Sequence, residues 1–170
     1  MREGSDVSTG IRAMAYMRAK GSSQGTFKDD SSRAGKDRTL CYAVRFRADV
    51  PHDVRGGKHA VTRHEPISVV HEWGPATVHF VTALWSNETL DEVVFEFVEP
   101  DKDGKEKTFA TLTLSKATVA YAELRSGNTD KLVAGEHHRP LGEVGLHAEK
   151  IELKLQADGG PMTAKYDGKS

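Results

Sequence analysis

The chain has 170 residues and carries 24 Lys and Arg against 25 Asp and Glu, which gives a net charge of −1. This length fits one domain with a hydrophobic core, and 37% hydrophobic with 29% charged residues is typical of a soluble globular protein. The single cysteine, Cys41, excludes a disulfide framework and any multi-cysteine metal site. No segment reaches the roughly 18 apolar residues of a membrane helix, and the polar residues 1–6 predict no signal peptide.

The charge is unevenly distributed along the chain. Residues 1–64 carry a net charge of +6 and residues 65–170 a net charge of −7. The basic part has no run of Lys and Arg with interleaved aromatic residues, so we do not expect nucleic-acid binding. A dipolar particle that can stack head to tail fits this pattern better.

Strands dominate the predicted elements of the N-terminal half. Residues 1–13 are polar and predict a flexible N-terminal extension. Alternation of apolar and polar residues predicts strands over 15–20 and 39–47, with a Gly- and Ser-rich loop over 21–38 that holds a short strand near Thr26. A turn-rich segment covers 49–58, and an extended segment follows over 64–72.

One segment has the pattern of an amphipathic helix. Pro75 suits the first helical position, and apolar positions recur at helical spacing through Phe80 to Leu84. We expect this helix to end near Asn87. His79 lies on its apolar face, where a hydrogen-bonded core histidine is more common than a metal ligand.

The C-terminal half predicts a hairpin and one long strand. Strands over 93–98 and 107–114 form a hairpin through a turn at 100–104, and a further strand covers 117–121. A second long loop covers 125–142. The apolar positions change parity between Ala148 and Ile151, which predicts a β-bulge or break at Glu149 and Lys150. Residues 156–170 predict a loosely held polar tail.

These elements amount to about seven strands and one helix. The spacing predicts a mainly β fold, a small antiparallel β-barrel of two packed sheets with one flanking α-helix and long extended loops. We expect the barrel domain to cover residues 14–155.

Motifs for catalysis or metal binding are missing from the sequence. Of the eight His, the pair His137 and His138 stands in a predicted loop, and no HExxH spacing occurs. The Gly-Lys pairs at 35–36 and 57–58 lack the rest of a phosphate loop, and no GxSxG elbow is present. We therefore expect no catalytic residues, no cofactor and no metal, and we predict that the chain is not an enzyme.

The loop after residue 49 favours assembly instead. A loop of about ten residues in a compact β domain is usually functional or disordered. This one combines Pro51, two glycines and charged residues, which suits an extension that reaches a neighbouring subunit.

An ordered set of segments resembles the haemolysin-coregulated protein family, Hcp, the tube subunit of bacterial type VI secretion systems. The segments are 50–58, the His64-Glu65-Pro66-Ile67 strand start, 72–75 before the helix, the hairpin of 93–114 and the closing strand from Glu143. The similarity spans roughly residues 14–155. No single motif carries it; the order of the segments does.

The resemblance implies a barrel that forms hexameric rings, which stack into a hollow tube. It also implies a VgrG-type spike, a contractile sheath and baseplate, and small effector proteins in the lumen as partners, with no nucleic acid and no stable membrane insertion. Such a tube is assembled in the bacterial cytoplasm and secreted without a signal peptide.

We predict the ring interface to lie in the first long loop. Its residues are Pro51, His52, Asp53, Val54, Arg55, Gly56, Gly57, Lys58 and His59. Three alternatives stay open: a tail-tube subunit of another phage-like contractile injection particle, a monomeric β-barrel that binds carbohydrate or lipid, and a zinc enzyme built on the histidines.

Overall fold

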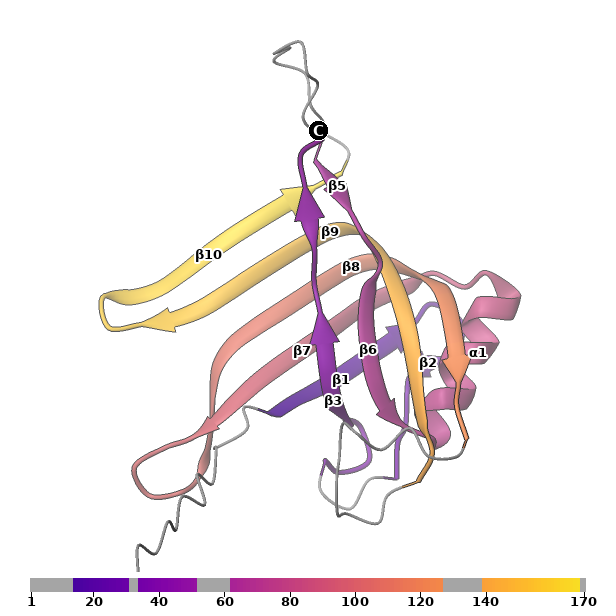
Figure 1. Cartoon of the computed structure of the whole chain (residues 1–170), viewed down its shortest axis with the longest axis horizontal. Coiled ribbons are helices and arrows are strands. Elements are labelled where there is room, and N and C mark those ends of the chain that lie inside the picture. The colour runs from indigo at the N-terminus through magenta and orange to yellow at the C-terminus, as the bar shows by residue number, and fades with distance from the viewer. Residues whose placement is uncertain (1–13, 31–33, 52–61, 127–138, 169–170) are drawn as a thin grey trace, which may run out of the picture.

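A computed structural model describes residues 14–30, 34–51, 62–126 and 139–168 of the chain (Figure 1). Ten strands and one helix lie within these residues: β1 (Met14–Gly21), β2 (Gly25–Thr26), β3 (Thr39–Arg45), β4 (Ala48–Asp49), β5 (Arg63–His64), β6 (Ile67–Glu72), α1 (Pro75–Ser86), β7 (Leu90–Pro100), β8 (Glu106–Leu124), β9 (Leu141–Ala157) and β10 (Gly160–Asp167).

Six of the strands close into an antiparallel barrel. The order is β9-β6-β3-β1-β7-β8, and β8 pairs again with β9 to complete the circle. β2 adds to β1, β10 adds to β9, and β4 with β5 forms a separate two-stranded ribbon. The structure confirms the predicted mainly β barrel with one flanking helix.

Alternating inward side chains fill the barrel. Phe95, Leu114 and Leu146 from three different strands are fully buried in one core cluster, together with Val69 from β6. On β1, the inward positions are held by small or flexible residues such as Ala15 and Met17. This alternation is what a strand with one buried face requires.

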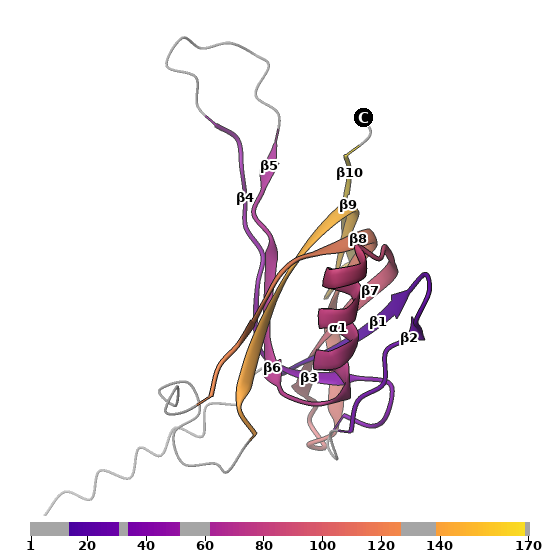
Figure 2. The same ribbon diagram turned by 90° about the vertical axis from the view of Figure 1, so that its right-hand side faces the viewer.

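The helix begins and ends where the sequence predicts. Pro75 occupies its first turn, and Asn87 ends it in the left-handed conformation with φ of 52°. Ala76, Phe80 and Ala83 pack into the barrel core, so α1 covers one side of the barrel (Figure 2).

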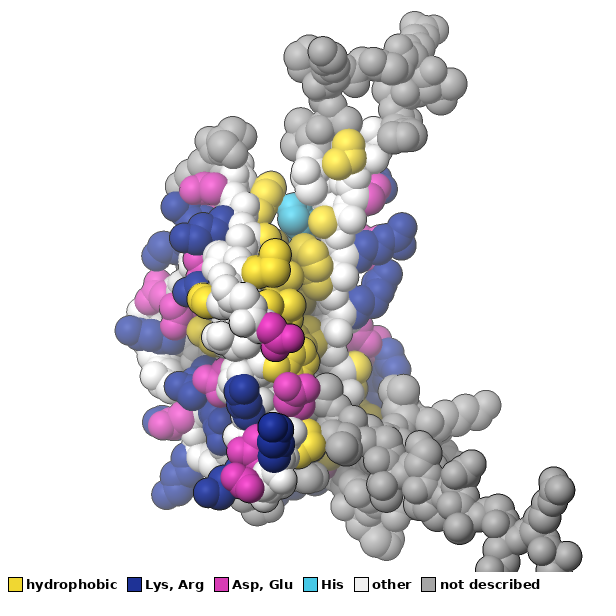
Figure 3. Space-filling view, turned by 90° about the vertical axis from the view of Figure 1, so that its left-hand side faces the viewer, with side chains coloured by type: hydrophobic (Ala, Val, Ile, Leu, Met, Phe, Trp, Pro, Cys, Tyr) yellow, Lys and Arg dark blue, Asp and Glu magenta, His cyan; other side chains and the backbone are white. Residues whose placement is uncertain are grey.

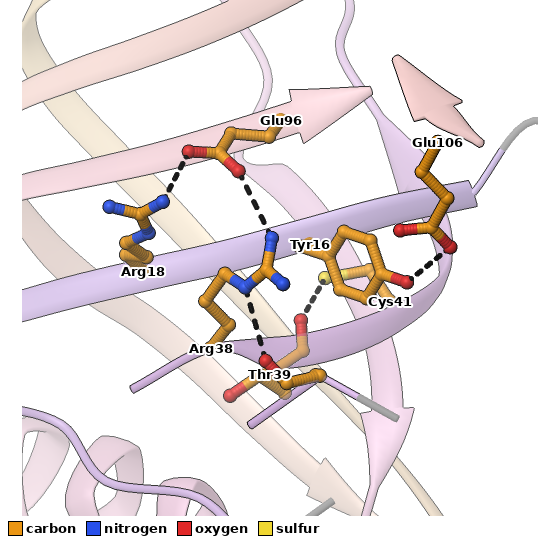
Figure 4. A network of polar contacts seen from close by, with 8 residues as sticks. Tyr16, Arg18, Arg38, Thr39, Cys41, Glu96 and Glu106 are labelled. Atoms are coloured by element: carbon orange, nitrogen blue, oxygen red, sulfur yellow. Dashed lines mark hydrogen bonds and ion pairs between the residues drawn. The ribbon is translucent and has the colours of Figure 1, made fainter. Parts of the chain in front are cut away.

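A polar network secures the outer face of β1. Tyr16 is buried and donates a hydrogen bond to Glu106 at 2.8 Å, while the guanidinium of Arg38 lies 4.4 Å from its ring centroid (Figure 4). Glu96 accepts from Arg18 at 2.7 Å and from Arg38 at 3.4 Å. The segment after residue 34 is thereby held against the sheet.

In β9 the buried positions switch from even-numbered to odd-numbered residues, but no register shift between β9 and β8 accompanies the switch. Ser115 pairs with Lys150 before it and Ala117 pairs with Ala148 after it, and both pairs belong to the same register. Lys116, between them, has a positive φ of 53°. Both strands change their buried face here, while the register shift lies between Val119 and Tyr121.

The expectation of a loosely held tail is wrong for most of the tail. Residues 160–167 form β10, which pairs with β9 along eight positions from Gly160 opposite Ala157 to Asp167 opposite Lys150. Tyr166 contributes to the core cluster, and Lys150 forms an ion pair with Asp167 at 3.0 Å. Likewise, the two strands expected over 107–121 form the single strand β8.

Candidate assembly surfaces

The described part of the predicted interface loop is its base. Ala48 pairs with His64 and Asp49 with Arg63 in the β4–β5 ribbon, where the Asp49 carboxylate accepts from the Arg63 guanidinium at 2.8 and 3.2 Å. Pro51 is exposed at the end of the ribbon. The remaining predicted interface residues, His52 to His59, lie outside the described residues.

The ribbon has one charged and one apolar side. Arg45 and Arg47 both reach Glu65, at 3.1 and 3.4 Å, on one side. Phe46, between the two arginines in sequence, is 45% exposed, and Val50 is also exposed. The ribbon therefore carries apolar side chains that the chain itself does not fully cover.

An apolar groove of about 310 Å³ lies beside this ribbon. One wall is formed by Val44, Phe46 and His64, and the other by the β9–β10 hairpin. Phe97 and Leu112 from β7 and β8 also line it. Figure 3 shows the hydrophobic side chains gathered in this hollow between two more polar parts of the surface.

The β9–β10 hairpin forms its wall through an amphipathic pattern. Leu153 pairs with Ala164, and Leu155 with Met162, so these four side chains share one face. Leu153 is 43% and Met162 is 65% exposed. On the other face, Glu152 forms ion pairs with Lys154 and Lys165 at 2.9 and 3.1 Å. The apolar face of the hairpin thus extends beyond the barrel core.

A histidine with unused hydrogen-bonding capacity lies in the groove. The ring of His64 contacts Tyr166 at 4.1 Å and Phe46 at 5.9 Å between centroids. Both of its ring nitrogens are shielded from solvent and have no hydrogen-bond partner among the described residues. Buried polar atoms are normally satisfied, so these two nitrogens are an exception among the described residues.

The outer face of α1 is a second exposed apolar surface. Val78 is 67% and Trp85 is 83% exposed. Residues 75–86 include no Lys, Arg, Asp or Glu, although 29% of the whole chain is charged. An exposed helix usually carries charges on its outer face, so this surface is unusual.

Contacts before and within the first half of α1 fix its position. The His79 ring stacks on Phe27 at 4.7 Å between centroids, and the Nδ1 atom of His79 lies 2.8 Å from Gln24 Oε1. Just before the helix, a Cβ added to Gly74 would lie 2.7 Å from Asp29 Oδ1, so the backbone there approaches a buried carboxylate closely. His79 is hydrogen-bonded as predicted, but it is half-buried and stacks on Phe27 at the edge of the core rather than lying within it.

Other chemically interesting residues serve the core. Cys41 and His71 lie opposite each other on β3 and β6 and are both buried. Burial, and then the charge of Asp29, raises the pKa of the Cys41 thiol. No group of three or more His, Cys, Asp or Glu among the described residues is arranged to hold a metal ion. His137 and His138 lie outside the described residues.

The groove and the helix surface are features that the sequence-based prediction does not contain. Ile151, Leu153 and Leu155 alternate with polar residues, and so do Met162, Ala164 and Tyr166. The alternation of Met162, Ala164 and Tyr166 does not lead to a predicted strand, because the Gly159-Gly160-Pro161 segment before it is as typical of a polar tail as of a hairpin turn. These glycines instead form the tight turn of a hairpin, where Gly160 has a φ of 111°.

The barrel, its flanking helix and its large uncovered apolar surfaces define a β-barrel protein suited to assembly. The type VI secretion system effector Hcp family model matches residues 16–155. The chain belongs to this family, whose members are tube subunits of the type VI secretion system. No curated protein matches the chain significantly.

Solved structures share this fold at low sequence identity. An Hcp protein crystal structure matches with a TM-score of 0.80 at 20% identity, covering 94% of this chain and 99% of that one. A double mutant of Hcp1 from the E. coli EAEC 042 pathovar gives 0.76 at 18%, over 92% and 99%. The secreted protein Hcp3 from Pseudomonas aeruginosa gives 0.71 at 18%, over 94% and 100%.

A membrane-spanning helix is not found in the described part of the chain.

Proposed function

We propose that this chain is a structural, non-catalytic subunit that forms hexameric rings, and that the rings stack into the hollow inner tube of a type VI secretion system. Its partners are then other copies of itself, a VgrG-type spike, the contractile sheath and baseplate, and small effector proteins in the lumen. It assembles in the cytoplasm and leaves the cell with the spike.

The observation that carries this proposal is the family match over residues 16–155 together with the uncovered apolar groove. The groove is lined mainly by apolar side chains, of which Phe46 is 45% and Leu153 43% exposed, and uncovered apolar surface of this kind marks interaction sites. A subunit that buries them against a neighbour gains roughly 25 cal/mol for each Å² removed from water.

The first long loop is proposed to bridge adjacent rings or subunits. The β4–β5 ribbon, held by the Asp49–Arg63 ion pair, projects from the barrel and supports the loop at its base (Figure 2). Because the β4–β5 ribbon extends away from the barrel, it can contact a neighbouring subunit that the barrel itself does not touch.

The native mass of the purified protein tests ring formation. We expect particles of about six subunits by analytical ultracentrifugation, and ring shapes in negative stain. A monomer at high protein concentration would exclude the tube function and favour the ligand-binding alternative.

Deletion of residues 55–58 tests the role of the loop. We expect the barrel to stay folded because residues 55–58 fall between β4 and β5 in the sequence and belong to none of the barrel strands, and we expect stacked tubes to be lost or shortened. Normal stacked tubes by electron microscopy would contradict the bridging role and leave ring formation intact.

A further inference from the structure

The two exposed apolar surfaces lie on opposite sides of the barrel and differ in shape. The helix α1 faces the viewer in Figure 2, and the groove faces the viewer in the opposite view of Figure 3. The first is convex, since Val78 and Trp85 project from a helix. The second is a hollow between the β4–β5 ribbon and the β9–β10 hairpin.

A closed ring needs this kind of pair. Each subunit in a cyclic ring of more than two members uses two different patches, one for each neighbour, because the contact is heterologous. A convex patch and a concave patch of matching chemistry on one chain satisfy that requirement. Two copies of the groove facing each other would leave both hollows unfilled.

The chemistry of the two surfaces matches as well. Val78, Val81 and Trp85 stand at i, i+3 and i+7, the spacing by which a helix lies in an apolar groove. The helix contains no charge that would have to be desolvated on entry. An exposed Trp is also the residue type that most often dominates the energy of an interface.

We propose that α1 of one subunit docks, through Val78 and Trp85, in the groove between the β4–β5 ribbon and the β9–β10 hairpin of the next subunit in the ring. This inference rests on the proposed ring-forming function and names the surfaces that close the ring.

Two variants and their mixture test the contact. Trp85→Glu damages the helix surface and keeps the groove, whereas Leu153→Glu places a charge in the groove lining and keeps the helix. Both side chains are exposed, so both variants should fold like the wild type by circular dichroism. We expect each variant alone to lose rings, with association weakened at least about 30-fold.

Mixing the two variants distinguishes this contact from any other. The intact groove of the Trp85→Glu chain can accept the intact helix of the Leu153→Glu chain, so the mixture should form one-to-one dimers and no rings. Trp85→Leu and Thr163→Glu are the controls, because the first keeps an apolar side chain and the second places charge on the exposed polar face of β10. Both should keep rings.

The outcomes separate this inference from the function on which it rests. If the wild-type chain forms no rings, the proposed function and this contact are both wrong. If it forms rings and either Trp85→Glu or Leu153→Glu also does, or if the mixture yields no dimers, the helix-in-groove contact alone is overturned.

Discussion

Glu88 holds Gln24 at two points. Glu88 Oε1 accepts the main-chain N–H of Gln24, and Glu88 Oε2 accepts its side-chain Nε2, both at 2.8 Å. The side chain of Gln24 also contacts α1, because the Oε1 atom of Gln24 lies 2.8 Å from the Nδ1 atom of His79. Gln24 therefore joins the turn after β1 to the helix, and the buried carboxylate of Glu88 holds Gln24 in place.

Replacing this carboxylate should loosen the helix. We expect Glu88→Gln to lower the free energy of unfolding by about 1–3 kcal/mol, because an amide cannot accept at both positions and turns a donor towards Gln24. Urea unfolding measures the change. Glu92→Gln, an exposed carboxyl on the neighbouring strand, is the matched control and should change little. Equal effects of the two substitutions would show that Glu88 has no special role.

The same contact should make stability depend on acid. Desolvation raises the pKa of Glu88, but hydrogen bonds from Gln24 and Ser23 outweigh it and leave this pKa below its ordinary value of 4.5. A lowered pKa in the folded state stabilises the protein above pH 4.5, and this contribution is lost as the pH falls further. Below pH 4.5, wild type should therefore lose stability more steeply than Glu88→Gln.

The aromatic ring of Tyr121 packs directly over Gly145. A Cβ at Gly145 would lie 2.1 Å from Tyr121 Cε1, and the Tyr121 hydroxyl donates to Glu143 at 2.6 Å. Burial, with the added effect of Glu143, raises the pKa of Tyr121 to about 12, so the hydroxyl stays a donor at neutral pH.

We expect Gly145→Ala to lower the free energy of unfolding by about 1–3 kcal/mol, because the ring must move away from its partner. Gly159→Ala is the matched control, since nothing lies within 4 Å of the position that its added methyl group would take. A thermal unfolding curve for Gly145→Ala that overlays that of the control would refute the packing argument.

His71 should remain neutral well into the acidic range. Burial lowers its pKa more than the Glu72 carbonyl and the charge of Asp29 raise it. As the pH falls below about 6.5, the unfolded chain binds a proton that the folded chain does not. The free energy of unfolding should then fall, with a limiting slope of about 1.4 kcal/mol per pH unit from this residue.

Two measurements check this titration. The His71 ring resonances should not move between pH 7 and 5.5 by NMR. His71→Leu should show a shallower loss of stability over the same range. Titration of His71 at an ordinary pH in the folded protein would contradict the prediction.

Local patterns in the sequence are sufficient to predict most of the barrel. Alternation locates β1, β3 and β6, and Pro75 with the apolar spacing after it locates α1, because one buried face imposes a period on each element. β10 is not predicted because glycine and proline indicate a turn equally well at a hairpin and at the start of a tail. Only the pairing of residues 160–167 with β9 in the folded chain distinguishes a hairpin from a tail.

The assembly surfaces are harder to predict for a related reason. The exposed positions of Val78 and Trp85 depend on which side of α1 meets the barrel, and helical spacing alone allows several choices. The groove combines side chains from Val44 to Tyr166, which only the closure of the barrel brings together. The predicted loop residues follow from composition and resemblance, and their role stays a prediction.

The face change at Lys116 limits how this protein can vary. β8 and β9 turn different sides towards the core before and after the same point without any shift in their pairing. Away from the register shift between Val119 and Tyr121, a single-residue insertion in either strand would exchange core and surface side chains along everything beyond it. Related chains should therefore gain and lose residues in the connecting segments and almost never within these two long strands, even where their sequences have diverged almost completely.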